Sequence, residues 1–261
     1  MAPLGISSGL MYVNYNEGGP AIQESEYSIE FDGTGYLDTG DTYQSTFRGS
    51  YTLACWAKWV GGTPNGTLFG ARTGVLDEVQ LLMNAGKLRF YMEGDSNDMV
   101  QETSDDDQLT TDDWYHVVVT VTKNSGSNTG VLLYVNGSAI DITNSGQLTE
   151  ANHNAYTSSA NLFIGARNTD GTNDGGWGTD SIGRIDEPAI WNVALDADAV
   201  AAIYNSGVPF DLTSNNGDYD NSGDLVGYWR FNEGNGTTAI DEGGSNNATL
   251  NGGATYSNDT V

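Results

Sequence analysis

Basic residues are scarce in this chain. Lysine and arginine together number 9, against 35 aspartate and glutamate residues, and the formal net charge is -26 at pH 7. Such a charge repels the phosphate backbone of nucleic acids and the headgroups of anionic lipids. We therefore expect neither a nucleic-acid partner nor a membrane partner. The acidity favours solubility and suits a saline medium, in which charges more than about 8 Å apart are largely screened.

Cysteine and long apolar runs are also nearly absent. The single cysteine, Cys55, excludes an internal disulfide and a thiolate metal site, and its apolar surroundings predict a buried side chain. No run reaches the ~18 apolar residues that a membrane-spanning helix needs. The first residues lack the positive and apolar regions of a secretory signal. Either the sequence is that of a mature chain, or the protein is made in a cytoplasm without a signal peptide and leaves by another route such as lysis.

Glycine and aromatic residues are abundant, with 35 glycines, 14 tyrosines and 6 tryptophans. This composition is typical of turns and aromatic-rich strands, and it supplies enough apolar surface for folding. About twelve short strands at roughly ten-residue spacing predict an all-β fold, a two-sheet antiparallel jelly-roll sandwich. Hairpins are expected within residues 79–92 and 114–140, the second with the strong turn signal Asn136-Gly137.

One segment, residues 183–207, combines a strand with the one short helix expected for the chain. Residues 185–191 alternate in the manner of a strand, and the residues that follow have helical spacing. Asp196 or Asp198 can cap the start of this helix, and Gly207 can end it. We expect the helix to plug an edge of the sandwich.

The predicted organisation is an extended N-terminal arm, residues 1–26, followed by one domain, residues 27–261. The arm has scattered glycines and weak periodicity. Residues 225–261 supply closing strands, which either complete the sandwich or begin a second domain. We expect them to complete it, because ~30 residues cannot bury a core of their own.

Six motifs resemble those of the laminin-G-like, concanavalin A-like jelly-roll domains, and they occur in family order. They lie at residues 27–40, 51–59, 114–121, 131–137, 161–167 and 184–187. A seventh stretch, residues 225–241, resembles the segment that opens the domain in many family members, although here it comes last. The resemblance implies a concanavalin A-like sandwich that serves binding.

Catalytic patterns are not found in the sequence. Hydrolases that share this sandwich carry a Glu-x-Asp-x-x-Glu-like run whose carboxyl groups act about 5 Å apart. Asp186 and Glu187 are adjacent, and adjacent side chains of a strand point to opposite faces, so we do not expect them to form such a pair. For His116, in a valine-rich strand, and His153, in a polar loop, we expect structural or surface roles. We therefore predict a protein that is not an enzyme.

Calcium is the cofactor that the sequence favours, because it needs only about six to eight oxygen ligands. The resemblance implies a shared calcium site at four acidic positions, with turn capping as the alternative role of each. These positions are Asp32, Asp186, Glu233 and Asp241. Residues 218–224 also imitate the start of a calcium loop, but Trp229 stands where the bidentate glutamate of such a loop belongs.

Sugar binding requires exposed aromatic faces beside hydrogen-bonding groups, which lectin folds place in loops. Trp177, in a glycine-rich loop, is the best-placed residue for this role, and Tyr156 with Asn154 is second. A lid over the edge of the sandwich is the alternative role of Trp177.

The predicted function is a non-enzymatic virion surface protein of a marine bacteriophage, of the capsid-decoration or head-fibre type, with glycan adhesion. The motivation is an adhesion-type fold without a signal peptide or disulfide, since cell lysis releases virion components. The arm would dock on a capsid or other virion protein, the sandwich would face a host-surface glycan, and homo-oligomer formation is left open. The alternatives are a secreted or cell-surface calcium-dependent carbohydrate-binding adhesin and an accessory module of a glycan hydrolase.

Overall fold

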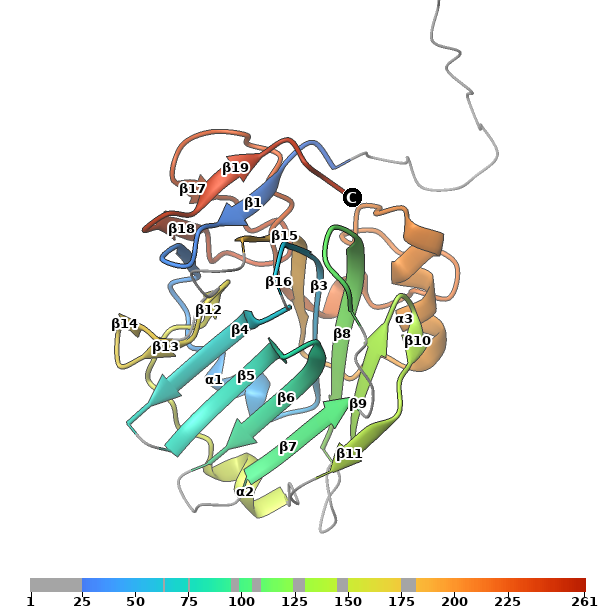
Figure 1. The fold of residues 1–261 in the computed structure, drawn as a ribbon. Coiled ribbons are helices and arrows are strands. Elements are labelled where there is room, and N and C mark those ends of the chain that lie inside the picture. Colours follow the sequence, from blue (N-terminus) through green and yellow to red (C-terminus); the bar gives the residue numbers. More distant parts are fainter. Residues whose placement is uncertain are drawn as a thin grey trace, which may run out of the picture.

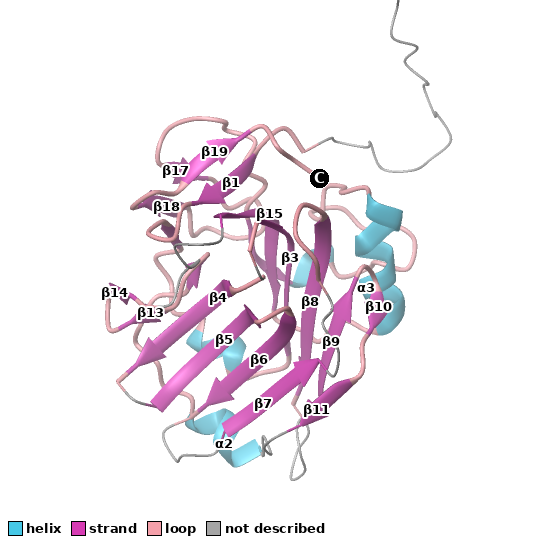
Figure 2. Ribbon diagram, viewed as in Figure 1, coloured by secondary structure: helices cyan, strands magenta, loops and turns pink. Residues whose placement is uncertain are grey.

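The computed structural model describes residues 25–62, 64–74, 76–94, 99–104, 109–123, 130–144, 150–174 and 182–261. These residues form a sandwich of two largely antiparallel sheets (Figures 1 and 2). The all-β, two-sheet architecture predicted from the sequence is confirmed.

The first sheet has eight strands. In spatial order they are β10 (Ser138–Ala139), β9 (Gly130–Val135), β8 (Trp114–Thr122), β3 (Tyr51–Val60), β15 (Ile182–Trp191), β1 (Ser28–Phe31) and β19 (Thr255–Ser257), with β16 (Leu225–Tyr228) paired to β15.

The second sheet has eleven strands. Its main path is β11 (Ile142–Asn144), β7 (Met99–Ser104), β6 (Lys87–Glu93), β5 (Leu76–Asn84), β4 (Gly66–Thr73), β12 (Phe163–Ile164), β2 (Tyr36–Asp38), β18 (Ala248–Asn251) and β17 (Thr238–Ala239). Beside this path, β13 (Asn168–Thr169) pairs with β4 and with β14 (Thr172–Asn173). More strands form than expected, because several are only two or three residues long and leave no periodic pattern in the sequence.

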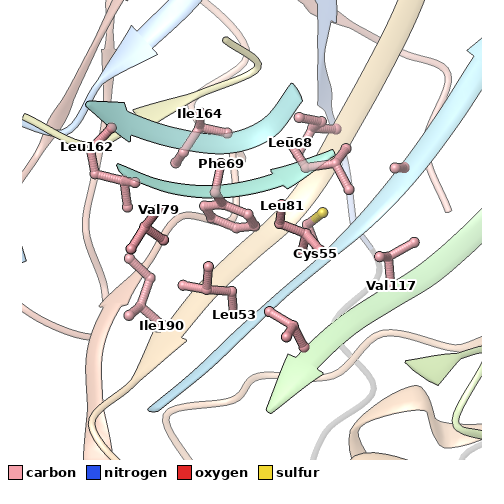
Figure 3. Close-up of a cluster of buried hydrophobic side chains, with 14 of the residues drawn as sticks. Leu53, Cys55, Leu68, Phe69, Val79, Leu81, Val117, Leu162, Ile164 and Ile190 are labelled. Atoms are coloured by element: carbon pink, nitrogen blue, oxygen red, sulfur yellow. The ribbon is translucent and has the colours of Figure 1, made fainter. Parts of the chain in front are cut away.

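The core lies between the sheets, because alternate side chains of each strand point inward. Figure 3 shows its centre, where Leu53 and Cys55 of the first sheet lie near Phe69, Val79 and Leu81 of the second. All five side chains are fully buried. The prediction for Cys55 is thus confirmed, and burial raises the pKa of its thiol well above the usual range.

Both predicted hairpin turns form. β5 and β6 pair around Ala85-Gly86, and β9 and β10 pair around Asn136-Gly137. The φ angles of these four residues are 52°, 83°, 50° and 76°, the left-handed conformation that two-residue turns require. β9 also pairs with β8, so the predicted second hairpin becomes a three-stranded meander.

The C-terminal strands pair with strands from earlier in the chain. β16 pairs with β15, β18 with β2, and β19 with β1. Residues 225–261 therefore contribute to both sheets of the sandwich. Of the predicted arm, residues 1–24 lie outside the described residues.

Three α-helices occur in the described parts of the chain: α1 (Gln44–Phe47), α2 (Glu150–Ala155) and α3 (Ala197–Tyr204). Short 3-10 turns, η1 (Asn205–Gly207) and η2 (Ser222–Asp224), accompany them. None of the described helices is long and apolar enough to cross a membrane. α3 is the predicted helix, and Asp196 caps it by accepting a hydrogen bond from Ala199 N at 2.9 Å. It ends at Asn205, in the left-handed conformation, two residues before the predicted Gly207.

α3 covers the outer face of the first sheet. Val200 and Ile203 of the helix pack with Ala54, Val118 and Tyr134, which belong to β3, β8 and β9, in a second buried apolar cluster. β3 and β8 lie within the sheet, and the helix also contacts β10, the edge strand, so α3 covers the outer face as far as one edge of the sheet. The outer face of the second sheet carries charged and polar side chains instead.

Candidate functional site

A hollow of about 390 Å³ lies beside β2 and β12 of the second sheet. Its lining consists of Tyr36, Asp38, Ser159, Ala160, Asn161, Phe163, Asn168, Asp170 and Gly171. Leu37 lies in the core between the sheets, so its neighbours Tyr36 and Asp38 face outward. We term this hollow the aromatic groove.

Two stacked rings form a wall of the aromatic groove. The ring centroids of Tyr36 and Phe163 lie 4.3 Å apart, and the ring planes differ by 20°. Phe163 is only 2% exposed, whereas Tyr36 is half-buried. The buried ring therefore supports the tyrosine ring and fixes its orientation at the groove.

The polar groups of the aromatic groove are held in place by the fold. Asp38 Oδ1 accepts a hydrogen bond from Asn161 Nδ2 at 3.0 Å. Buried Asn168 donates to Asn161 O at 2.9 Å and accepts from Gly171 N at 2.7 Å. The Asp170 carboxylate accepts from a backbone N–H at 3.1 Å. Groups that are already ordered bind a ligand with little loss of conformational entropy.

A second hollow of about 280 Å³ lies over β4, β5 and β6. Its lining consists of Arg72, Glu78, Gln80, Leu82, Arg89, Tyr91 and Arg167. β4 separates this hollow from the aromatic groove, because it pairs with β5 on one side and with β12 on the other. We term the second hollow the arginine groove, since it holds three of the 9 basic residues of the chain.

A buried glutamate links two of these arginines. Glu78 is 4% exposed, and its Oε1 accepts a hydrogen bond from Arg167 Nη1 at 2.9 Å. Its Oε2 lies 3.7 Å from Arg72 Nε. Arg167 Nη2 also donates to Asp174 Oδ2 at 2.8 Å. The two arginines are thus fixed by ion pairs at one side of the groove.

Asp186 and Glu187 form a buried acidic pair, which corrects the expectation that they point to opposite faces. A bulge interrupts the pairing of β15 with β3 between Asp186 and Ala189, and Glu187 has φ 49°. Bulges place two residues opposite one and redirect their side chains. Asp186 pairs with Trp56 of β3, and Glu187 and Trp56 line the same small hollow beneath α3.

Burial dominates the electrostatics of this pair. The two side chains are 0% and 4% exposed. Burial raises the pKa of Asp186 to about 7, and burial together with the charge of Asp186 raises the pKa of Glu187 to about 8. Glu187 accepts hydrogen bonds from the Tyr228 hydroxyl and from Arg230 Nε, and Asp186 accepts one from Ser25 Oγ at 2.7 Å.

The hollow beside the acidic pair is too small for a substrate. It measures about 10 Å³, which is room for about one water molecule. His116 lines it as well, and burial lowers the pKa of this histidine to about 3. His153 is also buried, with its ring edge-on to Tyr51, and burial lowers its pKa to about 4. The pair and both histidines are therefore parts of packed regions.

Of the predicted sugar-binding residues, the two that the structure describes, Tyr156 and Asn154, line neither groove. Trp177 lies outside the described residues. Asn154 is exposed and accepts a hydrogen bond from Lys123 Nζ. Tyr156 is fully buried, with its ring edge-on to Phe47 at 5.9 Å, so the prediction that it offers an exposed aromatic face is wrong.

The four predicted calcium ligands do not converge. Asp32 accepts hydrogen bonds from Thr34 within its own turn, Glu233 accepts one from Ile240 N at 2.8 Å, and Asp241 accepts four from backbone N–H groups. Among the described residues, no group of three or more histidine, cysteine, aspartate or glutamate side chains could hold a metal ion. These residues do not fit a shared site, and calcium binding elsewhere in the chain stays a prediction.

Comparison with known proteins identifies the family of this sandwich. The family model of the concanavalin A-like lectin/glucanases superfamily matches residues 31–201, more than half of the chain. The chain belongs to this superfamily. A comparison with curated protein sequences finds no match.

Two solved structures have a fold similar to that of this chain. A Bacteroides ovatus protein proposed to bind carbohydrate matches with TM-score 0.57 and 19% identity, over 92% of this chain and 61% of its own length. The carbohydrate-binding module of a Ruminococcus gnavus sialidase, bound to α2,3-sialyllactose, matches with TM-score 0.51 and 19% identity, over 72% of this chain and 100% of its own. This chain thus spans less than two thirds of the Bacteroides protein, and both similarities concern the fold.

Sequence reasoning missed the residues of both grooves, although a signal for them exists. In residues 36–38, an inward Leu37 leaves Tyr36 and Asp38 on the outer face. In residues 87–92, Arg89 and Tyr91 alternate with buried apolar residues in the same way. Two features of the sequence thus indicate the grooves. One is an outward aromatic ring beside a carboxylate, and the other is an outward arginine in a chain with few basic residues.

Proposed function

We propose that this superfamily member is a non-catalytic carbohydrate-binding protein whose ligand occupies the aromatic groove. The observation that carries the proposal is the Tyr36 ring, supported by Phe163 and accompanied by Asp38 and Asn161. An aromatic face can stack on the apolar face of a sugar while fixed carboxylate and amide groups bond to its hydroxyls. The volume of about 390 Å³ falls within the roughly 300–1,000 Å³ of small-ligand sites.

Two further considerations support binding without catalysis. The Bacteroides ovatus relative is proposed to bind carbohydrate, and the Ruminococcus gnavus module is a carbohydrate-binding module bound to a saccharide. The acidic pair Asp186 and Glu187 is buried beside a hollow of about 10 Å³. A saccharide therefore has no access to these two carboxyl groups.

The experiment for this proposal is a glycan array probed with the full chain, followed by calorimetry with the saccharides that bind. We expect Tyr36→Ala to weaken binding at least about tenfold, because the substitution removes the stacking face. Tyr27→Ala, at another half-buried tyrosine outside the groove, is the matched control and should bind like the wild type. A silent array, or equal affinity of the two variants, would contradict the proposal.

We further propose that the protein acts on the surface of a virion, with residues 1–26 docking it on a capsid or other virion protein. The support is compositional: an adhesion-type fold with a net charge of -26 and one buried cysteine. Mass spectrometry of purified particles is the test, and absence of the protein from them ends the proposal. Recovery in cell-surface fractions instead would favour an adhesin. Deletion of residues 1–26 should abolish particle binding while leaving glycan binding intact.

A further inference from the structure

We infer that the arginine groove binds the acidic group of a saccharide, a carboxylate or a sulfate, so that the protein selects acidic glycans. This inference rests on the proposed function of the neighbouring aromatic groove. The two hollows lie on the two sides of β4, so a saccharide of several residues that fills one can extend to the other.

The arginine groove is less acidic than the chain as a whole, because its three arginines face three carboxylates: Glu78 in its lining, and Asp174 and Glu93, which bond to Arg167 and Tyr91 of the lining. Its lining holds three arginines and one glutamate, in a chain with 9 basic and 35 acidic residues. At physiological ionic strength, charges further than about 8 Å away are largely screened. The groups of the groove itself, rather than the acidic surface elsewhere, therefore decide which ions it attracts.

Arg89 is the guanidinium that is free to meet a ligand. Arg72 and Arg167 are already engaged with Glu78, and Arg167 also with Asp174. Within the described parts of the chain, the Arg89 guanidinium has neither an ion pair nor a hydrogen bond to another residue. A carboxylate or sulfate accepts two parallel hydrogen bonds from one guanidinium, which gives a geometry that lysine cannot match.

Two buried donors of the groove lack partners. Arg89 Nε and Arg167 Nε are buried N–H groups for which the described residues provide no hydrogen-bond acceptor. Buried polar groups in proteins are almost always satisfied, and an exception calls for a water, an ion or a ligand. Both nitrogens belong to side chains that line the arginine groove.

The remaining lining suits the carbon skeleton of a sugar. Leu82 and Tyr91 are half-buried and lie on β5 and β6 between the charged groups. The Tyr91 hydroxyl donates to Glu93 Oε2 at 2.8 Å, which holds the ring in place. Gln80 is fixed by a hydrogen bond from its Nε2 to Thr67 Oγ1 at 2.6 Å. An inorganic anion needs no such apolar surface, whereas an acidic sugar does.

The test measures binding of the full chain to matched acidic and neutral probes by calorimetry. One pair is tetragalacturonic acid and its methyl ester, and the other is a sulfated carrageenan tetrasaccharide and its desulfated form. The two arms distinguish a carboxylate ligand from a sulfated one. We expect at least one acidic probe to bind about tenfold more tightly than its neutral counterpart, the typical effect of one charge-assisted hydrogen-bond pair.

Arg89→Gln should abolish this preference for the acidic probe while leaving affinity for the neutral probe unchanged. Lys87→Gln is the matched control, because it removes the same charge from the same strand but lines neither groove. Tyr36→Ala should weaken acidic and neutral probes alike. Equal binding of the acidic and neutral probes, or a preference that survives Arg89→Gln, would overturn the inference and leave the aromatic groove as the binding site.

If no saccharide binds, the proposed function fails, and anion binding to the arginine groove must be measured separately. Nuclear magnetic resonance of the arginine Nε–Hε groups during titration with inorganic sulfate supplies it. A sulfate-dependent shift of Arg89 that is retained in Lys87→Gln would support an anion site, and its absence would overturn one. Urea unfolding of each variant verifies that the fold is intact.

Discussion

The buried acidic pair of β15 should make the protein lose stability as the pH rises from about 6.5 to 8, and Asp186→Asn should remove most of that loss. Burial raises the pKa values of Asp186 and Glu187 to about 7 and 8, from ordinary values of 3.8 and 4.5. A raised native-state pKa contributes stability that is fully present below the unfolded-state pKa. That stability disappears as the pH rises through the native-state pKa.

The magnitude follows from the number of protons that the native state retains. Between pH 5 and pH 7 the unfolded chain has released both protons, whereas the native pair still holds at least one. Each retained proton lowers the free energy of unfolding by about 1.4 kcal/mol per pH unit as the pH increases. Arg230 and the Tyr228 hydroxyl favour ionised Glu187, so one retained proton is the number we expect.

The two buried histidines act in the opposite direction over part of this range. Burial lowers the pKa of His116 to about 3 and that of His153 to about 4, below the ordinary value of 6.5. Their stability contribution is present above pH 6.5 and is lost as the pH falls towards 4. Between about pH 6.5 and 8 the contribution of the histidines no longer changes, so the change of the free energy of unfolding with pH there reports the acidic pair.

Urea unfolding of the wild type and Asp186→Asn from pH 5 to 8.5 measures the effect. Asparagine keeps the shape of Asp186 and one acceptor oxygen, but it removes the charge beside Glu187. We expect the variant to gain on the wild type by up to about 1.4 kcal/mol per pH unit above pH 6.5, and the gain to level off once the pH passes the native-state pKa values of about 7 and 8. Asp218→Asn, at an exposed position, is the control for the general effect of the net charge. Parallel stability profiles of Asp186→Asn and the wild type would refute the reasoning.

Two further predictions concern the fold and the metal. Gly165→Ala should destabilise the protein by about 3 kcal/mol in urea unfolding, because Gly165 has φ +83° and a β-carbon there would lie 2.2 Å from Phe31 Cε1. A smaller loss than that of Gly171→Ala, whose β-carbon meets nothing, would contradict this. Melting with EDTA and with calcium tests the predicted calcium dependence. A midpoint raised by calcium would support a site other than the four carboxylates, which are engaged separately, and equal midpoints would contradict the predicted calcium binding.

Local signals account for the parts of this fold that were predictable. Asn136-Gly137 specifies its own tight turn, and Asp196 caps α3 within one helical turn. The strands follow from alternation, which gives two faces but not which sheet each face belongs to. For that reason the sequence predicted α3 at an edge without predicting that the helix, besides contacting the edge strand β10, covers Ala54 and Val118 in the middle of the first sheet.

Non-local pairing accounts for what the sequence could not provide. The bulge at Glu187 depends on the register of β15 against β3, whose residues lie about 130 positions earlier in the chain. Tyr36 meets Phe163 only because β12 inserts between β2 and β4. Burial of Tyr156 likewise depends on its packing against Phe47, far away in sequence. Composition indicated an aromatic binding surface without indicating which rings form it.

The two outer faces of the sandwich explain why a binding site belongs on the second sheet. On the first sheet, α3 and Phe210 bury the outer side chains of β3, β8, β9 and β15 in an apolar cluster. On the second sheet, half-buried Tyr36 and Arg89 line two hollows that β4 separates. The presence of three of the 9 basic residues on that face works against an apolar cover, since burying charged groups is costly. A polar ligand with apolar sugar faces satisfies both the rings and the charges, and the acidic-glycan experiment addresses this combination directly.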